Sequence, residues 1–103
     1  MKIDLLYFEG CPSWQEGLEN LKTALSLESI AADINLVRIE SDADAARSRF
    51  LGSPSFRVNG VELWQDQRER YNLSCRVYPT PAGLKGAPTV EMLQEKLRTI
   101  KTS

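Results

Sequence analysis

Apolar residues along the chain form two kinds of pattern. Residues 3–8 and 33–39 are short apolar runs of the kind that form β-strands. The segment after the first run begins near Pro12 or Ser13 and repeats apolar residues at helical spacing. This pattern predicts a helix whose buried face consists of Trp14, Leu18, Leu21 and Leu25.

The second apolar run predicts a buried strand followed by a second helix. Residues 33–39 carry apolar side chains on both faces, as buried parallel strands do. Ser41 is a suitable N-cap for the next helix because its side-chain oxygen accepts a hydrogen bond from the first turn. We expect Gly52 to end this helix and its inner face to be Ala43, Ala46 and Phe50.

The second half of the chain predicts a β-hairpin, a long connection and a final helix. Residues 55–58 and 61–64 flank Asn59-Gly60, a pair that favours a tight hairpin turn because both residues tolerate positive φ. A connection at about 65–88 follows, within which 73–78 is expected to be ordered. Thr89 is expected to cap a helix with an inner face of Val90, Leu93, Leu97 and Ile100.

The resulting order, β-α-β-α-β-β-α, predicts a single α/β domain over residues 1–103. A right-handed crossover makes the first two strands parallel neighbours, and the hairpin adds two antiparallel strands. We therefore expect a four-stranded mixed sheet with helices on both faces.

Composition limits the classes of function. The chain has 103 residues, of which 42% are hydrophobic and 26% charged, as in a small soluble domain. A net charge of −1 gives no basic excess for nucleic-acid binding, and no apolar run is long enough to span a membrane. The start of the sequence does not resemble a secretion signal. We expect a cytoplasmic protein that is a monomer or a weak dimer and binds neither nucleic acid nor membranes.

The candidate chemistry lies in two cysteines. Cys11 falls between the first strand and the first helix, where the positive end of the helix dipole favours a thiolate, so we expect it to be accessible and reactive. The chain has no histidine, which excludes Cys/His proteases and imidazole zinc sites. The expected chemistry therefore uses thiols and backbone amides, with no cofactor and no metal site.

The position of Cys11 after the first strand and of Ser53-Pro54 before the third resembles the thioredoxin superfamily. Segments 7–12, 50–55, 57–60 and 75–78 are also similar to small bacterial thioredoxin-like proteins, some of which carry selenoprotein-like or alkylmercury-lyase-like labels. The resemblance implies a thioredoxin-like fold with a cis Pro54 against Cys11. It also implies that the backbone of Ser53, next to Pro54, pairs with substrate. Pro12, Trp14 and Pro54 are further candidate substrate contacts, although we prefer Trp14 as a packing residue because it falls on the inner face of the first helix.

The chain departs from the family at Trp14, where the usual motif has a second cysteine. Cys75 is the remaining candidate for a resolving thiol, because the connection after the hairpin leaves from the Cys11 end of the sheet and is long enough to reach it. Sequence does not decide whether the two thiols meet, and the alternative is that Cys75 packs in the core.

Three functions follow from these residues. The first is thiol–disulfide exchange, an oxidoreductase activity with Cys11 and Cys75 as catalytic residues. Its substrate contains a disulfide or a thiol, and Cys75 or glutathione resolves the adduct. The second is a thiolate site for a soft metal such as mercury or copper, and the third is a redox-inactive thioredoxin-like scaffold. Arg57 and Arg76 are either contacts for an anionic ligand such as glutathione or, as we prefer, solvated surface charges.

Overall fold

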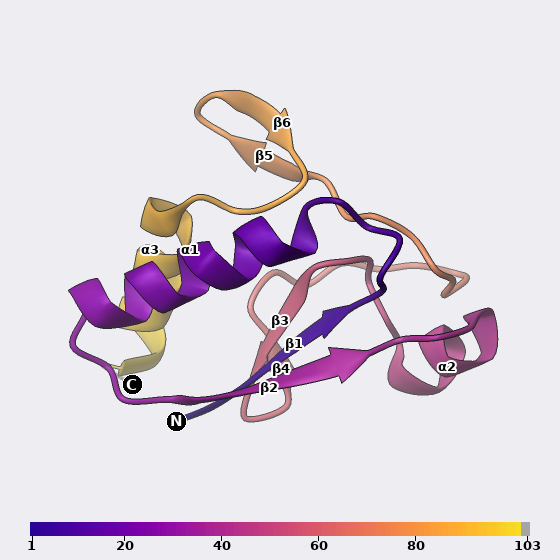
Figure 1. Cartoon of the computed structure of the whole chain (residues 1–103), viewed down its shortest axis with the longest axis horizontal. Coiled ribbons are helices and arrows are strands. Elements are labelled where there is room, and N and C mark those ends of the chain that lie inside the picture. Colours follow the sequence, from indigo (N-terminus) through magenta and orange to yellow (C-terminus); the bar gives the residue numbers. More distant parts are fainter. Residues whose placement is uncertain (102–103) are drawn as a thin grey trace.

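A computed structural model of the chain describes residues 1–101. Within this range the chain is α/β, with three helices, a four-stranded mixed sheet and a separate two-stranded sheet (Figure 1). The elements are β1 (Lys2–Tyr7), α1 (Trp14–Leu27), β2 (Asp33–Arg38), α2 (Asp42–Ser48), β3 (Ser55–Val58), β4 (Val61–Glu62), β5 (Tyr78–Thr80), β6 (Gly83–Lys85) and α3 (Val90–Lys101).

The larger sheet has the strand order β2-β1-β3-β4. β1 pairs in parallel with β2 and antiparallel with β3, so that Leu5 lies between Leu36 and Phe56. β3 pairs antiparallel with β4 around the turn at Asn59 and Gly60, both of which have positive φ. The predicted strand directions are therefore confirmed, although β4 ends two residues earlier than expected.

β2 corrects one prediction. It is parallel to β1 as expected, but it is an outer strand rather than a buried one, and Leu36 is 44% exposed. Apolar residues on both faces of a short run therefore did not identify a central strand here. Burial depends on which elements cover the strand, and this information is not local to the run.

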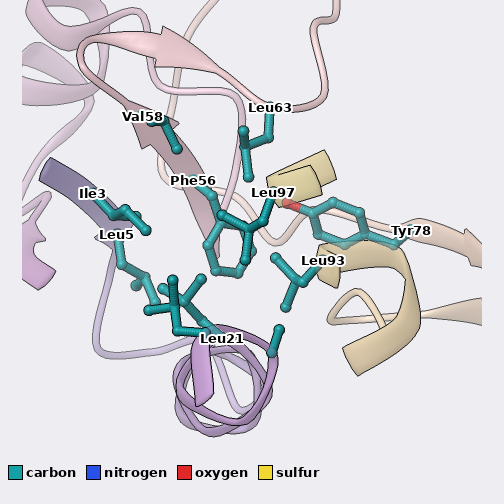
Figure 2. Close-up of a cluster of buried hydrophobic side chains, with 11 residues drawn as sticks. Ile3, Leu5, Leu21, Phe56, Val58, Leu63, Tyr78, Leu93 and Leu97 are labelled. Carbon is teal, nitrogen blue, oxygen red and sulfur yellow. The ribbon is translucent and has the colours of Figure 1, made fainter. Parts of the chain in front are cut away.

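Two clusters of buried side chains lie on opposite faces of the sheet. Leu5 belongs to the larger cluster and Leu6 to the smaller, because successive side chains on a strand point to opposite faces. The larger cluster lies between the sheet and the helices α1 and α3, and Figure 2 shows Leu21, Leu93 and Leu97 meeting strand residues there. The smaller cluster joins Leu6 to Ile39, Ala45 and Phe50 at α2. Helices therefore cover both faces, as predicted.

α1 packs closely against the strand β3. Leu21 and Leu25 are buried as predicted, whereas Trp14 and Leu18 are half-buried. Gly17 permits the close approach, since a Cβ atom there would lie 2.9 Å from Cγ of Pro54. The helix is thereby held directly over the loop that precedes β3.

α2 begins as predicted but presents a different face to the core. The Ser41 hydroxyl accepts a hydrogen bond from the Asp44 N–H at 3.1 Å, which confirms the N-cap. Ala45 is buried, whereas Ala43 and Ala46 are exposed, so that part of the predicted inner face is wrong. Alanines on several faces of a two-turn helix do not define which face turns inward.

The end of α2 also differs from the prediction. Arg49, with φ 52°, is the left-handed residue at the C-terminus of α2, so Gly52 does not end the helix. Gly52 has a different role in the loop before β3, described below.

The connection after β4 contains a hairpin that was not predicted. β5 and β6 pair antiparallel, with Pro79 opposite Leu84, and project from the body of the domain on the side of α1 (Figure 1). Proline in one strand and glycine in the other are unfavourable strand residues, so local sequence gave no strand signal. Thr89 then caps α3 as predicted, accepting a hydrogen bond from the Met92 N–H at 3.1 Å.

None of the helices within residues 1–101 has both the length and the apolar character needed to cross a membrane.

Candidate functional site

Cys11 lies in the turn between β1 and α1, with its side chain directed toward the loop before β3. Its N–H donates to the Phe8 carbonyl at 3.1 Å, and its thiol donates to the Ser53 carbonyl at 3.3 Å. The residue is only 3% exposed. The expectation that Cys11 is accessible is therefore wrong, because its sulfur is covered by the fold.

The loop that faces Cys11 contains the cis peptide bond between Ser53 and Pro54, as the resemblance implied. Both residues are fully buried. The Tyr78 hydroxyl donates a hydrogen bond to the Pro54 carbonyl, and Pro54 packs against Gly17 of α1. The loop is thus fixed from the helix side and from β5.

The backbone of Ser53 is already paired with another part of the chain. Its N–H donates to the Ser74 carbonyl at 2.8 Å, and its carbonyl accepts from the Arg76 N–H at 3.0 Å. These bonds form an isolated parallel bridge between Ser53 and Cys75. The peptide groups that the resemblance assigned to substrate binding are therefore taken by the chain's own segment.

Gly52 makes this pairing possible. Its φ is +110°, and a Cβ atom built there would lie 3.0 to 3.1 Å from the backbone and Cβ of Arg76. Glycine is therefore required both for the backbone conformation and for the close approach of the segment that carries Cys75.

Cys75 is exposed, so the alternative that it packs in the core is wrong. Its thiol is a neighbour of the Cys11 thiol. The sulfur is nevertheless partly shielded from water, which is the largest cause that raises the pKa of the Cys75 thiol. A hydrogen bond with Cys11 and the charge of a Cys11 thiolate raise this pKa further. The structure therefore brings together the two cysteines and the cis-proline loop, and Ser53 contacts both cysteine segments.

Replacing Cys11 by alanine is expected to lower the pKa of the Cys75 thiol. The substitution removes the hydrogen bond and the like charge that oppose ionisation of Cys75. The rate of alkylation of Cys75 against pH should therefore shift to lower pH in Cys11→Ala. An unchanged profile would show that the thiols do not interact, and circular dichroism of the variant controls for loss of the fold.

The other two predicted contact residues lie differently. The Trp14 ring stacks on Tyr7, with centroids 4.1 Å apart and planes inclined by 25°, and packs against the larger core cluster. Pro12 is exposed beside Cys11. Trp14 is thus a packing residue that orients the start of α1, whereas Pro12 remains on the surface next to the thiol pair.

Arg57 and Arg76 are both used by the fold. Arg57 donates to the carbonyls of Ser48 and Arg49 and lies 3.5 Å from the Glu62 carboxylate. Arg76 is only 7% exposed, donates to the Trp64 carbonyl and lies over the Tyr78 ring. The preferred interpretation as solvated charges is thus wrong for Arg76, and neither guanidinium is left free for an anionic ligand.

Glu62 completes a partly buried charge cluster with these arginines. Burial of its carboxyl raises its pKa, and the attraction of Arg57 and Arg76 only partly offsets that effect. Neither carboxylate oxygen has a hydrogen-bond partner within residues 1–101. This cluster was not predicted, because a charged residue in a two-residue strand carries no local sign of burial.

Replacing Glu62 by glutamine is expected to weaken the dependence of the free energy of unfolding on pH between acid and neutral conditions. A raised pKa means that the folded state binds the proton more tightly than the unfolded state, so the free energy of unfolding falls as pH rises above the ordinary carboxyl pKa. Glu62→Gln should lose this fall and be at least as stable as the parent near pH 7. Urea unfolding at several pH values between acid and neutral measures this difference in the free energy of unfolding. The same substitution at the exposed Glu91, Glu91→Gln, is the control.

Comparison of the chain with family models, with curated proteins and with solved structures gives no match in any of the three. Within residues 1–101 no group of three or more cysteine, aspartate or glutamate residues is placed to hold a metal ion. The site is therefore defined by its own geometry, as a pair of neighbouring thiols in an α/β domain, one exposed and one buried.

Proposed function

We propose that this chain is a thioredoxin-like thiol–disulfide exchange protein that acts through Cys75 and Cys11. The observation that carries the proposal is the placement of an exposed thiol next to a buried one, with both cysteine segments bonded to Ser53. The sheet order and the cis Pro54 beside Cys11 are compatible with the thioredoxin-like fold that this proposal assumes.

The exposure of the two thiols sets the order of the steps. The Cys75 thiolate attacks a disulfide of the substrate, forms a mixed disulfide and releases one substrate thiolate, which takes up a proton from water. Cys11 then attacks the Cys75 sulfur, and its proton passes to the departing substrate sulfur. This step forms the Cys11–Cys75 disulfide and releases the second substrate thiol. Two electrons pass from the protein dithiol to the substrate disulfide.

This order reverses the roles expected from the sequence, where Cys11 attacks and Cys75 resolves. A buried sulfur cannot meet a substrate disulfide, but it can attack a sulfur that is already its neighbour. The raised pKa of Cys75 leaves little thiolate at neutral pH, so the first step should accelerate as pH rises. Substrates are disulfide- or thiol-containing molecules, with glutathione among the candidates, and we expect the protein to act in the cytoplasm.

The test is a single-turnover oxidation of the reduced protein by a small linear disulfide such as bis(2-hydroxyethyl) disulfide. We expect the loss of two hydrogen atoms per chain by mass spectrometry. Digestion without a reductant should then give two peptides, one containing Cys11 and one containing Cys75, joined by a disulfide. If oxidation produces only dimers linked through Cys75, the proposal fails, and the redox-inactive scaffold becomes the better interpretation.

The same pair of thiols favours a second function, two-coordinate binding of a soft ion such as Hg(II) or Cu(I). Two neighbouring thiolates, with no third cysteine, aspartate or glutamate placed beside them among residues 1–101, suit soft ions that accept linear coordination. One equivalent of the ion should then block both thiols together. Thiols that are blocked one at a time would count against this function without affecting disulfide exchange.

A further inference from the structure

The segment around Cys75 alternates between buried and exposed side chains. Arg76 and Tyr78 point into the protein, whereas Leu73, Cys75 and Val77 are exposed. A period of two is that of an extended strand, and the bridge to Ser53 confirms that the chain is extended here. The exposed thiol is therefore flanked, two residues away on either side, by exposed apolar side chains.

The β5–β6 hairpin extends this apolar surface. Pro79 and Leu84 form a pair across the hairpin and are both exposed. The chain after β6 is held beside the start of α1, because a Cβ atom on Gly86 would overlap the Ser13 side chain. The hairpin thus stands next to the turn that contains Cys11.

The extended segment has one closed edge and one open edge. The Ser74 carbonyl and the Arg76 N–H both bond to Ser53. Because backbone groups of successive residues in an extended chain point to opposite sides, the N–H and carbonyl of Cys75 point away from Ser53. Within residues 1–101 these two groups have no hydrogen-bond partner. An edge with a free N–H and carbonyl can accept another extended chain by strand addition.

We propose that the open edge at Cys75 binds an extended polypeptide whose disulfide is flanked by apolar side chains, and that this polypeptide is the substrate. The inference rests on the proposed function and adds the substrate class. The substrate strand pairs with the N–H and carbonyl of Cys75, and its apolar side chains cover Leu73 and Val77.

The geometry of strand pairing suits the covalent step. In an antiparallel pair that exchanges both hydrogen bonds, the opposite Cα atoms lie about 5.5 Å apart. This separation falls in the range of about 4.4 to 6.8 Å found for disulfide-linked residues. The Cβ atoms of such a pair lie about 4.5 to 5.5 Å apart, slightly more than the roughly 3.5 to 4.5 Å of a disulfide. A cysteine opposite Cys75 would therefore form the mixed disulfide after a small closing movement of the two strands.

The charges around the site favour such a peptide over glutathione. Glutathione is anionic and needs cationic contacts, but Arg57 is paired with Glu62 and Arg76 is buried on the inner side of the segment. Arg68, which donates to the Ser74 hydroxyl, is paired with Asp66. The surface beside the thiol is instead formed by Leu73 and Val77. Binding energy for a substrate should therefore come from apolar contact and backbone pairing.

The experiment compares four disulfides on the Cys11→Ser chain, which cannot resolve the adduct and so accumulates the mixed disulfide at Cys75. The first is the symmetric disulfide of a short peptide whose cysteine has valine two positions before and after it. The second has serine at those positions, and the third keeps valine but carries an N-methyl group on the cysteine amide. The fourth is oxidised glutathione. Intact mass spectrometry gives the rate of adduct formation for each.

We expect the valine peptide to react about tenfold or more faster than the serine peptide and glutathione, because two buried valines supply at least that factor. N-methylation should remove much of the advantage, since it deletes a backbone donor. Equal rates for all four disulfides would overturn the inference and leave disulfide exchange intact. No adduct with any of them would overturn the proposed function itself.

Surface variants provide the matched control. Val77→Ser should reduce the advantage of the valine peptide, whereas Val61→Ser on β4 should not. The two valines have almost the same exposure, 57% and 59%, so neither substitution disturbs the core. The same loss in both variants would contradict docking at the Cys75 edge.

Discussion

Cys75→Ser is expected to abolish reaction of the folded protein with external disulfides. The remaining thiol, Cys11, is buried and bonded to the Ser53 carbonyl, so it reacts only when the structure opens. We expect the rate of exchange to fall by about a hundredfold or more, which corresponds to an opening free energy of about 3 kcal/mol. Single-turnover kinetics with bis(2-hydroxyethyl) disulfide, followed by mass spectrometry, measure the effect.

The reciprocal variant distinguishes this order of steps from the reverse. Cys11→Ser should retain the first step and accumulate a mixed disulfide on Cys75, because only the resolving thiol is lost. If Cys75→Ser instead reacts as fast as the parent and accumulates an adduct on Cys11, then Cys11 is the attacking thiol. Denatured samples of both variants should react alike, which controls for the intrinsic reactivity of the two cysteines.

Gly52→Ala is expected to destabilise the fold and to separate the two thiols. A non-glycine residue at φ +110° costs about 1 to 3 kcal/mol in the free energy of unfolding. The added Cβ also lies 3.1 Å from the Arg76 backbone and 3.0 Å from its Cβ, which pushes the 74–76 segment away from Ser53. We expect the Cys11–Cys75 disulfide to form markedly more slowly in Gly52→Ala. The loss of stability measured by urea unfolding should not be large enough to account for this slower rate.

Gly60→Ala is the matched control for this prediction. Gly60 also has a positive φ, +86°, but a Cβ atom there meets nothing within 4 Å. Both variants should therefore lose stability in urea unfolding, whereas only Gly52→Ala should lose the coupling between the thiols. A similar rate of disulfide formation in the two variants would show that the contact with Arg76 does not position Cys75.

Local sequence signals predicted the elements that have local causes. Ser41 and Thr89 cap their helices, Asn59-Gly60 turns the hairpin, and the leucines of α1 and α3 face the larger cluster. The cis bond before Pro54 was predicted by resemblance, together with the facing position of Cys11. These features depend on spacing or on a few neighbouring residues, which a single sequence contains.

The parts that failed depend on contacts between distant segments. Cys11 is buried because the Ser53 loop and the segment of Cys75 lie against it, and nothing in residues 9–14 indicates this cover. Arg76 is buried because its guanidinium donates to the Trp64 carbonyl and lies over the Tyr78 ring, although arginine is ordinarily a surface residue. The alternation of apolar and polar residues over 73–76 was the available sequence signal of an extended segment, although its apolar side chains are the ones that face outward.

The bond from the Cys11 thiol to the Ser53 carbonyl has a thermodynamic consequence. Folding holds two distant chain segments at the same loop, so a covalent bridge between residues 11 and 75 would mainly restrict the unfolded chain. For a loop of this size the chain-entropy model gives about 4 kcal/mol of added resistance to unfolding. By linkage, the native state favours the bridge by the same amount. Oxidation of the two thiols should therefore raise the melting temperature. In variants with a weakened core, the disulfide between residues 11 and 75 should be reduced more easily.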